Sequence, residues 1–262
     1  FIKGAFSQYL SPTVIDQIVA NPDMLKLGGE KREMTPFFSD IQGFSTISEG
    51  LTPEELVQLL NEYLTAMCDI ISSHHGTIDK FEGDAIIAFW GAPLDLPNHA
   101  TVACYATIEM QKRSVELRKM LREQNRPLLY TRMGLNSGPV VVGNMGSAER
   151  MDYTMMGDVV NLAARLEGAN KFYKTYSMIS GSTYELVKDD VDSRQLDIIR
   201  VVGKNEPVPV HELLARKNET SSEMSGVVEQ YLKGLKLYQD RNFADAVKEF
   251  EKVLTIDPDD GP

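Results

Sequence analysis

The 262-residue sequence predicts an α+β fold, a ferredoxin-like, palm-like sandwich in which helices cover an antiparallel sheet. Three observations lead to this prediction. The expected elements follow the order strand, helix, strand, strand, helix, strand. Two long segments, one beginning at Thr52 and one from Asn98 to Glu123, carry apolar residues at helical spacing. Two short apolar runs meet at Gly83-Asp84, as hairpin strands meet at a two-residue turn.

The first strand and the hairpin are expected to bring two aspartates together. The first strand is the apolar run Met34–Phe38, which ends abruptly before Asp40, and the hairpin strands are Thr77–Glu82 and Ala85–Trp90. If the hairpin lies beside the first strand, Asp40 and Asp84 meet at one edge of the sheet. Neighbouring carboxylates repel each other unless cations lie between them, and hard oxygen ligands suit Mg²⁺ or Mn²⁺. On spacing alone, a strand-end aspartate and a turn aspartate are common without such a role.

The remaining elements follow in order along the chain. Strands are expected at Leu128–Asn136, Pro139–Val142, Tyr176–Ile179, Leu196–Val202 and Val208–Leu214, and helices from Asp158 to about Gly168 and from Ser182 to Val187. Residues 143–153 are glycine-rich and polar, and we expect them to form a loop. A polymerase palm has the same element order, so the fold alone does not identify a reaction.

The chain divides into four predicted segments: a helical lead-in over residues 1–30, the main domain over 31–215, a polar linker over 216–225 and a helical pair over 226–262. The last segment matches the tetratricopeptide pattern for one helical pair at Leu235, Tyr238, Phe243, Ala246, Phe250, Leu254 and Pro258. A single repeat cannot bury its own apolar face. Either further repeats follow it or it packs on the main domain, and it is also a candidate site for a protein partner.

Composition limits the classes of partner. The net charge of −11 argues against a nucleic-acid-binding surface, which needs a basic patch. Cys68 and Cys104 lie among apolar residues and form no metal-ligand cluster, so we expect buried thiols in a reducing, cytoplasmic compartment. No apolar run is long enough to span a bilayer. The chain begins at Phe1 rather than Met, so we expect a fragment of a longer protein, whose other parts could include a membrane anchor.

Four motifs occur in order along the chain: FSDIQGFS, KFEGDAIIAFWG, RMGLNSGPVVVGNMG and DYTMMGDVVNLAARLE. Together they resemble the class III nucleotidyl cyclases, the adenylate/guanylate cyclase catalytic domain family, over roughly Lys31 to Leu214. The resemblance implies a bacterial-type adenylate cyclase that makes cyclic AMP and pyrophosphate from ATP. The alternatives are a guanylate cyclase and a catalytically silent nucleotide-sensing scaffold with a tetratricopeptide arm.

The resemblance implies a metal site shared between subunits. It assigns Asp40 and Asp84 to two divalent cations, Mg²⁺ or Mn²⁺, with the backbone carbonyl of Ile41 as an extra ligand. In this family the two halves of a site come from different subunits, placed head to tail. A chain that carries both halves is therefore expected to form a homodimer with two equivalent sites.

The resemblance assigns the catalytic roles to Asn161 and Arg165. Asn161 would position the ribose, and Arg165 would stabilise the charge that develops at the α-phosphate. Residues four apart share one helix face, so the two side chains can act on one ligand. From the residues alone, a surface ion pair with Glu167 or Asp158 is the better explanation of Arg165.

Other residues are implied to bind the nucleotide phosphates. Arg132 matches the arginine that contacts the triphosphate tail. The segment from Phe38 through Ile41 to Gly43, with Phe44 after it, is expected to present backbone N–H groups to the phosphates at the start of a helix.

Two residues are implied to read the base. Lys80 matches the lysine that contacts adenine, and Thr154 matches the second adenine contact of a bacterial subgroup. Lysine can only donate hydrogen bonds, and adenine N1 accepts one. Guanylate cyclases place Glu and commonly Cys at these positions, so this pair favours ATP over GTP.

The chain departs from the family pattern at one position. Val202 stands where the family usually has a late lysine that binds the triphosphate. Arg200 or Lys204 could replace that lysine, so the departure puts the pyrophosphate contact in doubt more than the reaction.

Overall fold

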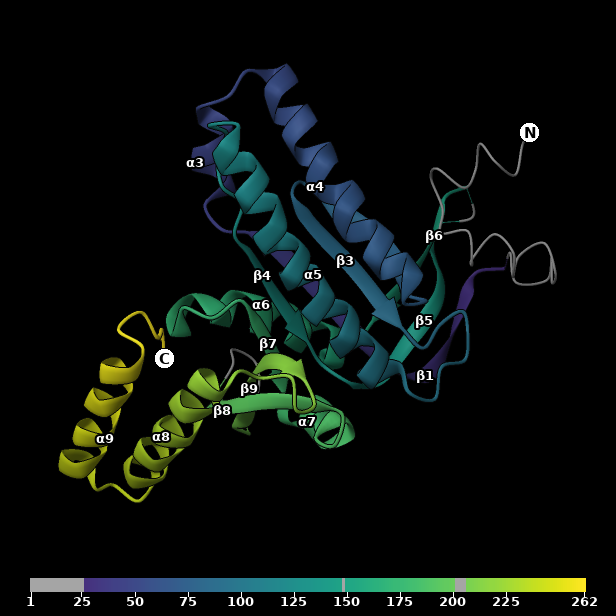
Figure 1. The fold of residues 1–262 in the computed structure, drawn as a ribbon. Helices are drawn as coiled ribbons and strands as arrows, with labels where there is room; N and C mark the ends of the chain where they lie inside the picture. Colours follow the sequence, from purple (N-terminus) through teal and green to yellow (C-terminus); the bar gives the residue numbers. More distant parts are fainter. Residues whose placement is uncertain (1–25, 148, 201–205) are drawn as a thin grey trace.

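The computed structural model describes residues 26–147, 149–200 and 206–262 (Figure 1). These residues form a nine-stranded sheet with helices on both faces. The predicted lead-in helix lies outside the described residues, and so do Val202 and Lys204. None of the described helices is both long enough and apolar enough to cross a membrane.

The strands are β1 (Gly28–Ile41), β2 (Thr77–Glu82), β3 (Ala85–Trp90), β4 (Thr131–Leu135), β5 (Gly138–Gly146), β6 (Met151–Met156), β7 (Ser177–Ser180), β8 (Val191–Ile199) and β9 (Val208–Arg216). Their order in the sheet is β2-β3-β1-β4-β7-β9-β8, and β5 pairs with both β1 and β6. The first four strands pair antiparallel in the order β2-β3-β1-β4, which confirms the predicted ferredoxin-like arrangement. Only the contact between β4 and β7 is parallel among the paired described strands.

The helices are α3 (Phe44–Glu49), α4 (Pro53–Ser73), α5 (His99–Glu123), α6 (Asp158–Tyr173), α7 (Gly181–Val187), α8 (Ser222–Gln239) and α9 (Phe243–Ile256). Helices α4 and α5 lie side by side across one face of the sheet (Figure 1). The N-terminus of α4 is a capping box in which Thr52 and Glu55 satisfy each other's backbone N–H groups. The predicted apolar stripe of α4 is buried against β1 and β3, where Phe37 and Trp90 pack edge to face.

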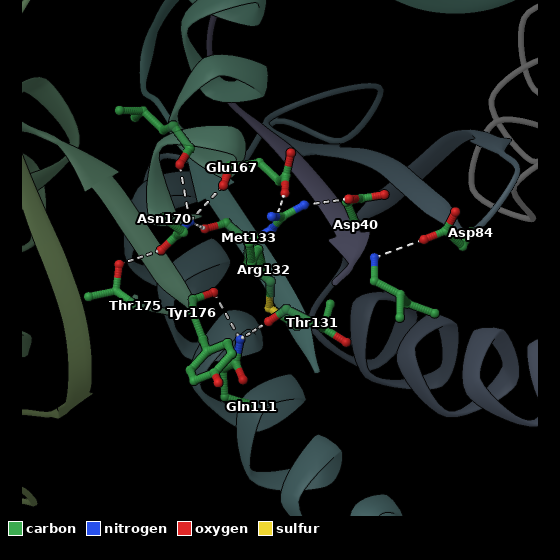
Figure 2. A network of polar contacts seen from close by, with 12 residues as sticks. Asp40, Asp84, Gln111, Thr131, Arg132, Met133, Glu167, Asn170, Thr175 and Tyr176 are labelled. Carbon is green, nitrogen blue, oxygen red and sulfur yellow. Dashed lines mark hydrogen bonds and ion pairs between the residues drawn. The ribbon is translucent and has the colours of Figure 1, made fainter. Parts of the chain in front are cut away.

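Helix α6 covers the opposite face, because β4 has a glycine at the point of contact. Met133 and Leu135 point into the α4–α5 core, and Gly134 between them faces α6. A Cβ atom on Gly134 would lie 2.2 Å from the backbone nitrogen of Glu167, so only glycine permits this close approach. The buried Asn170 amide donates to the Met133 carbonyl at 2.9 Å and holds α6 on β4 (Figure 2). This packing places Glu167 of α6 near Asp40 at the end of β1.

The prediction of a loop over residues 143–153 is wrong. Strand β5 continues to Gly146 and β6 begins at Met151, so strands occupy most of the segment predicted to be a loop. The glycines of this segment permit close strand pairing, because a Cβ on Gly143 would lie 2.2 Å from the Gly28 carbonyl oxygen. Strand β1 also starts earlier than predicted, at Gly28, because its first half pairs with β5.

The C-terminal helices α8 and α9 form a hairpin that packs on the sheet. Arg194 of β8 is 1% exposed and forms ion pairs with Glu212 of β9 and with Asp260, which follows α9. The Tyr231 hydroxyl of α8 donates to the Leu196 carbonyl at 2.9 Å. Of the two alternatives for this pair, the described residues show packing on the main domain.

The segment that joins the main sheet to α8 is shorter than predicted. Strand β9 runs to Arg216, and the Ser221 side chain caps α8, so residues 217–221 form the connection instead of 216–225. The connection is also held in place, because the Thr220 N–H donates to Asp192 at 3.3 Å.

Candidate active site

Asp40 and Asp84 lie together at the edge of the sheet, at the end of β1 and in the turn between β2 and β3 (Figure 2). The Ile41 N–H donates to Asp84 Oδ2 at 2.9 Å, which fixes the hairpin turn against β1. Burial raises the pKa of Asp84, the Ile41 N–H opposes this, and the negative charge of Asp40 raises the pKa further. A cation bound between the two carboxylates would therefore relieve their electrostatic repulsion.

Arg132 of β4 lies opposite Asp40 in the strand register and bridges two acids. Its Nη2 donates to Asp40 Oδ2 at 2.6 Å, and its Nε donates to Glu167 Oε1 at 2.9 Å. Figure 2 shows the guanidinium between the two carboxyl groups. Burial raises the pKa of Glu167 to about 7, while the positive charge of Arg132 opposes that shift and the negative charge of Asp40 adds to it. The sequence analysis considered Glu167 only as an alternative ion-pair partner of Arg165, and it missed the contact of Glu167 with Arg132.

The available ligands fit a divalent cation whose coordination is completed by phosphate oxygens of a substrate. Asp40, Asp84 and the Ile41 carbonyl offer hard oxygen ligands, and the Arg132 guanidinium already places one positive charge on Asp40. Within the part of the chain that the structure describes, no group of three His, Cys, Asp or Glu side chains could hold a metal ion by itself. Mg²⁺ is commonly bound by one or two carboxylates together with substrate phosphates, and this arrangement matches that pattern.

Several backbone groups of the segment predicted to bind phosphates are already paired within the fold. Phe38 lies inside β1 and pairs with both β3 and β4, and the Ile41 N–H is bonded to Asp84. The Gln42 N–H donates to the Tyr130 carbonyl at 2.7 Å. The backbone that can turn toward a phosphate therefore starts at Gly43, whose φ of 70° places it in the left-handed region before α3.

The two residues predicted to read the base surround one buried carboxylate. Thr154 Oγ1 donates to Asp79 Oδ2 at 2.7 Å, and Lys80 Nζ lies 3.7 Å from Asp79 Oδ1. Lys80 is 41% exposed and Asp79 only 3%. Thr154 lies on β6 and Lys80 on β2, so the tertiary fold brings them together. No motif pointed to Asp79, which sequence reasoning missed.

Asn161 and Arg165 lie on the first half of α6, with Asn161 exposed and Arg165 half-buried. Glu167 pairs with Arg132, and within the described part of the chain no ion pair joins Arg165 to Glu167 or Asp158. Residues two apart on a helix point about 200° away from each other. Because Glu167 faces Arg132, the side chain of Arg165 starts from the opposite side of α6. Arg200, the predicted substitute for a triphosphate lysine, is exposed after β8.

Comparison with known proteins gives a consistent set of relatives. The family model described as "Adenylate and Guanylate cyclase catalytic domain" matches residues 29–214. Adenylate cyclase 1 of Rhizobium meliloti is 39% identical over 184 residues, which are 70% of this chain and 28% of that protein. The chain spans less than half the length of the curated relatives it matches.

Two solved structures have similar folds. The crystal structure of the adenylyl cyclase CyaB from P. aeruginosa superposes with a TM-score of 0.68 at 39% identity, over 74% of this chain and 100% of that one. The crystal structure of the guanylyl cyclase Cya2 has a TM-score of 0.68 at 36% identity, over 74% and 98% of the two chains. Structures of both substrate types therefore resemble this chain to a similar degree.

Proposed function

The chain belongs to the adenylate and guanylate cyclase catalytic domain family, and from this premise we propose that it is an adenylate cyclase, which converts ATP to 3′,5′-cyclic AMP and pyrophosphate. The observation that carries the proposal is the meeting of Asp40 and Asp84 at one sheet edge, with Arg132 bound to Asp40. Similarity alone does not choose the base, because relatives of both kinds match. Lys80 and Thr154, which meet at Asp79, support adenine.

The reaction joins the ribose 3′-oxygen to the α-phosphorus and breaks the bond from that phosphorus to the leaving pyrophosphate. Class III cyclases depend on divalent cations, and two Mg²⁺ or Mn²⁺ ions would lower the pKa of the 3′-hydroxyl and neutralise the phosphates. Asp40 and Asp84 would hold these cations. Arg132 would exchange Asp40 for the triphosphate tail while Glu167 holds its Nε, a role that its contacts with both acids support. Asn161 would orient the ribose, and Arg165 would stabilise the charge on the α-phosphate.

We further propose that the active form is a homodimer with sites between subunits. The direction of α6 supports this, because Glu167 faces Arg132 and the side chain of Arg165 therefore starts from the opposite side of the helix. One chain alone would not bring Arg165 to a nucleotide held at Asp40 and Asp84. A second copy placed head to tail would complete both sites.

The direct test measures cyclic products from the pure protein. The wild type with Mn²⁺ should form cyclic AMP from ATP and much less cyclic GMP from GTP. Asp84→Asn should abolish the product, because it removes a charge that holds the cations. Asp95→Asn, which changes an exposed aspartate in the loop after β3, is the matched control and should stay active. An Asp84→Asn enzyme as active as the control would disprove the metal assignment.

A mixing experiment tests the shared site. Asp40→Asn and Arg165→Ala should each inactivate both sites of their own homodimer. In a mixed dimer both lesions fall in one site and the other site is native. With random mixing about half of the dimers are mixed, so about a quarter of wild-type activity should return. Labelled chains are used to show that subunits exchange between dimers. If they exchange and no activity returns, the site lies within one chain.

Two further expectations belong with this proposal. A protein partner could bind the outward face of α8 and α9, where Tyr238, Phe243, Val247 and Leu254 are each at least 50% exposed. A cytoplasmic location would supply the ATP that the proposed reaction consumes.

A further inference from the structure

We propose that Asp79 fixes the hydrogen-bonding direction of the Thr154 hydroxyl and thereby makes the site select adenine over guanine. Asp79 is a positioning residue in this proposal, because it acts through Thr154 and does not touch the base itself. The inference rests on the proposed function, since it requires Lys80 and Thr154 to contact the base of a nucleotide substrate.

A β-bulge aims the Asp79 side chain at Thr154. In the pairing of β2 with β3, Ile78 lies opposite Ala88 and Lys80 lies opposite Ile87, so Asp79 is an extra residue without a partner. A bulge breaks the alternation of side chains along a strand and can redirect one of them. The redirected carboxylate reaches β6, where Thr154 lies 75 residues away in the sequence. The contact is therefore made by the tertiary fold.

The contact sets which hydrogen bonds Thr154 can still make. An ionised carboxylate only accepts hydrogen bonds, so the single hydroxyl proton of Thr154 is donated to Asp79 Oδ2, at 2.7 Å. The threonine oxygen then offers only lone pairs to a ligand. Adenine presents an amino group at its six-position, which donates to such an oxygen. Guanine presents a carbonyl there, and two acceptors facing each other would repel.

Without Asp79, Thr154 would not discriminate between the two bases. A free threonine hydroxyl rotates, so it accepts from an amino group or donates to a carbonyl as the ligand requires. Discrimination thus arises from Asp79, although Thr154 makes the contact. Lys80 would supply the second part of the selection at N1, and its ammonium lies 3.7 Å from Asp79 Oδ1.

The burial of Asp79 also points to a functional use. Its Oδ1 atom is buried and has no hydrogen-bond partner among the described residues, which costs stability, and a functional role would explain why the arrangement is kept. The pKa of Asp79 is raised overall, because burial and the negative charge of Asp152 raise it more than the Thr154 hydroxyl and the charge of Lys80 lower it. The Thr154 hydroxyl and Lys80 favour the ionised form that the proposal needs.

The test compares substrate preference in three proteins. The ratio of kcat/KM for ATP to that for GTP is measured for the wild type, Asp79→Asn and Asp152→Asn. Asp79→Asn keeps the size of the side chain but adds an amide donor, so Thr154 can turn its proton toward guanine. We expect the ratio to fall about tenfold or more. Asp152 is an exposed acid on the same strand as Thr154, so Asp152→Asn removes a nearby charge and should leave the ratio unchanged.

A double-mutant cycle separates positioning from a general structural effect. In a Thr154→Val background, Asp79→Asn should change the ratio no further, because the hydroxyl that it orients is absent. Should Asp79→Asn not fold, Asp79→Ser serves instead, since a smaller neutral side chain also leaves Thr154 free to rotate. A loss of rate that is equal for ATP and GTP in these variants would overturn the inference and leave the proposed function standing. A wild type that cyclises neither nucleotide would instead overturn the proposed function.

Discussion

Glu167→Gln should remove a pH dependence of stability that the wild-type fold carries. Burial raises the pKa of Glu167 from an ordinary 4.5 to about 7, with Arg132 opposing the shift. An acid with a higher pKa in the folded chain stabilises the fold fully below its unfolded pKa, and this stabilisation is lost as pH rises through the folded pKa. Glutamine keeps an oxygen that accepts from Arg132 Nε but does not titrate. The wild type should therefore lose stability relative to the variant as pH rises.

The magnitude follows from the size of the pKa difference. Raising a pKa from 4.5 to about 7 corresponds to about 3 kcal/mol, since each unit contributes about 1.4 kcal/mol. Roughly 2.5 kcal/mol of this falls between pH 5 and pH 8. The side chain of Glu167 is 15% exposed, so solvent screening reduces the effect only modestly.

The assay is urea unfolding followed by circular dichroism at pH 5, 6.5 and 8. EDTA is present throughout, because a divalent cation near Asp40 would change the local charge. The difference in unfolding free energy between wild type and Glu167→Gln should shift by roughly 2 to 3 kcal/mol in favour of the variant as pH rises. Glu116→Gln, at a surface pair with Arg113, is the control and should show a constant difference. Parallel pH curves of unfolding free energy for wild type and Glu167→Gln would show that the pKa of Glu167 is not raised in the fold.

Two more predictions concern packing. Asp260→Ala should lower the free energy of unfolding by about 3 kcal/mol, because it removes one partner of the buried Arg194 guanidinium; an unchanged urea midpoint would mean that this pair does not hold the C-terminal helices on the sheet. Gly134→Ala should destabilise by several kcal/mol or prevent soluble expression, because the new Cβ would lie 2.2 Å from the Glu167 backbone nitrogen. The control is Gly168→Ala, on the same helix as Glu167, where a Cβ atom would meet open space. This change should be neutral or stabilising in thermal unfolding.

Local patterns in the sequence were enough to predict the central sheet and the proximity of Asp40 and Asp84. These features depend on local patterns: an apolar run that ends at Asp40, a two-residue turn at Gly83-Asp84, and apolar stripes at helical spacing. Such patterns set the type of each element, and short connections leave few ways to arrange the elements. The family motifs added the expected roles of Lys80, Thr154 and Arg165, which remain predictions until variants are assayed.

The surroundings of these residues depend on long-range contacts and could not be predicted from local patterns. Glu167 meets Arg132 across 35 positions of sequence, and Asp79 meets Thr154 across 75. The glycines in residues 143–153 suggested a loop but permit tight strand pairing, because only the neighbouring strand shows why a side chain is missing. A local sequence pattern predicts the conformation of its own segment. It does not predict which distant backbone group or charged side chain lies within hydrogen-bonding distance, because that depends on how the whole chain packs.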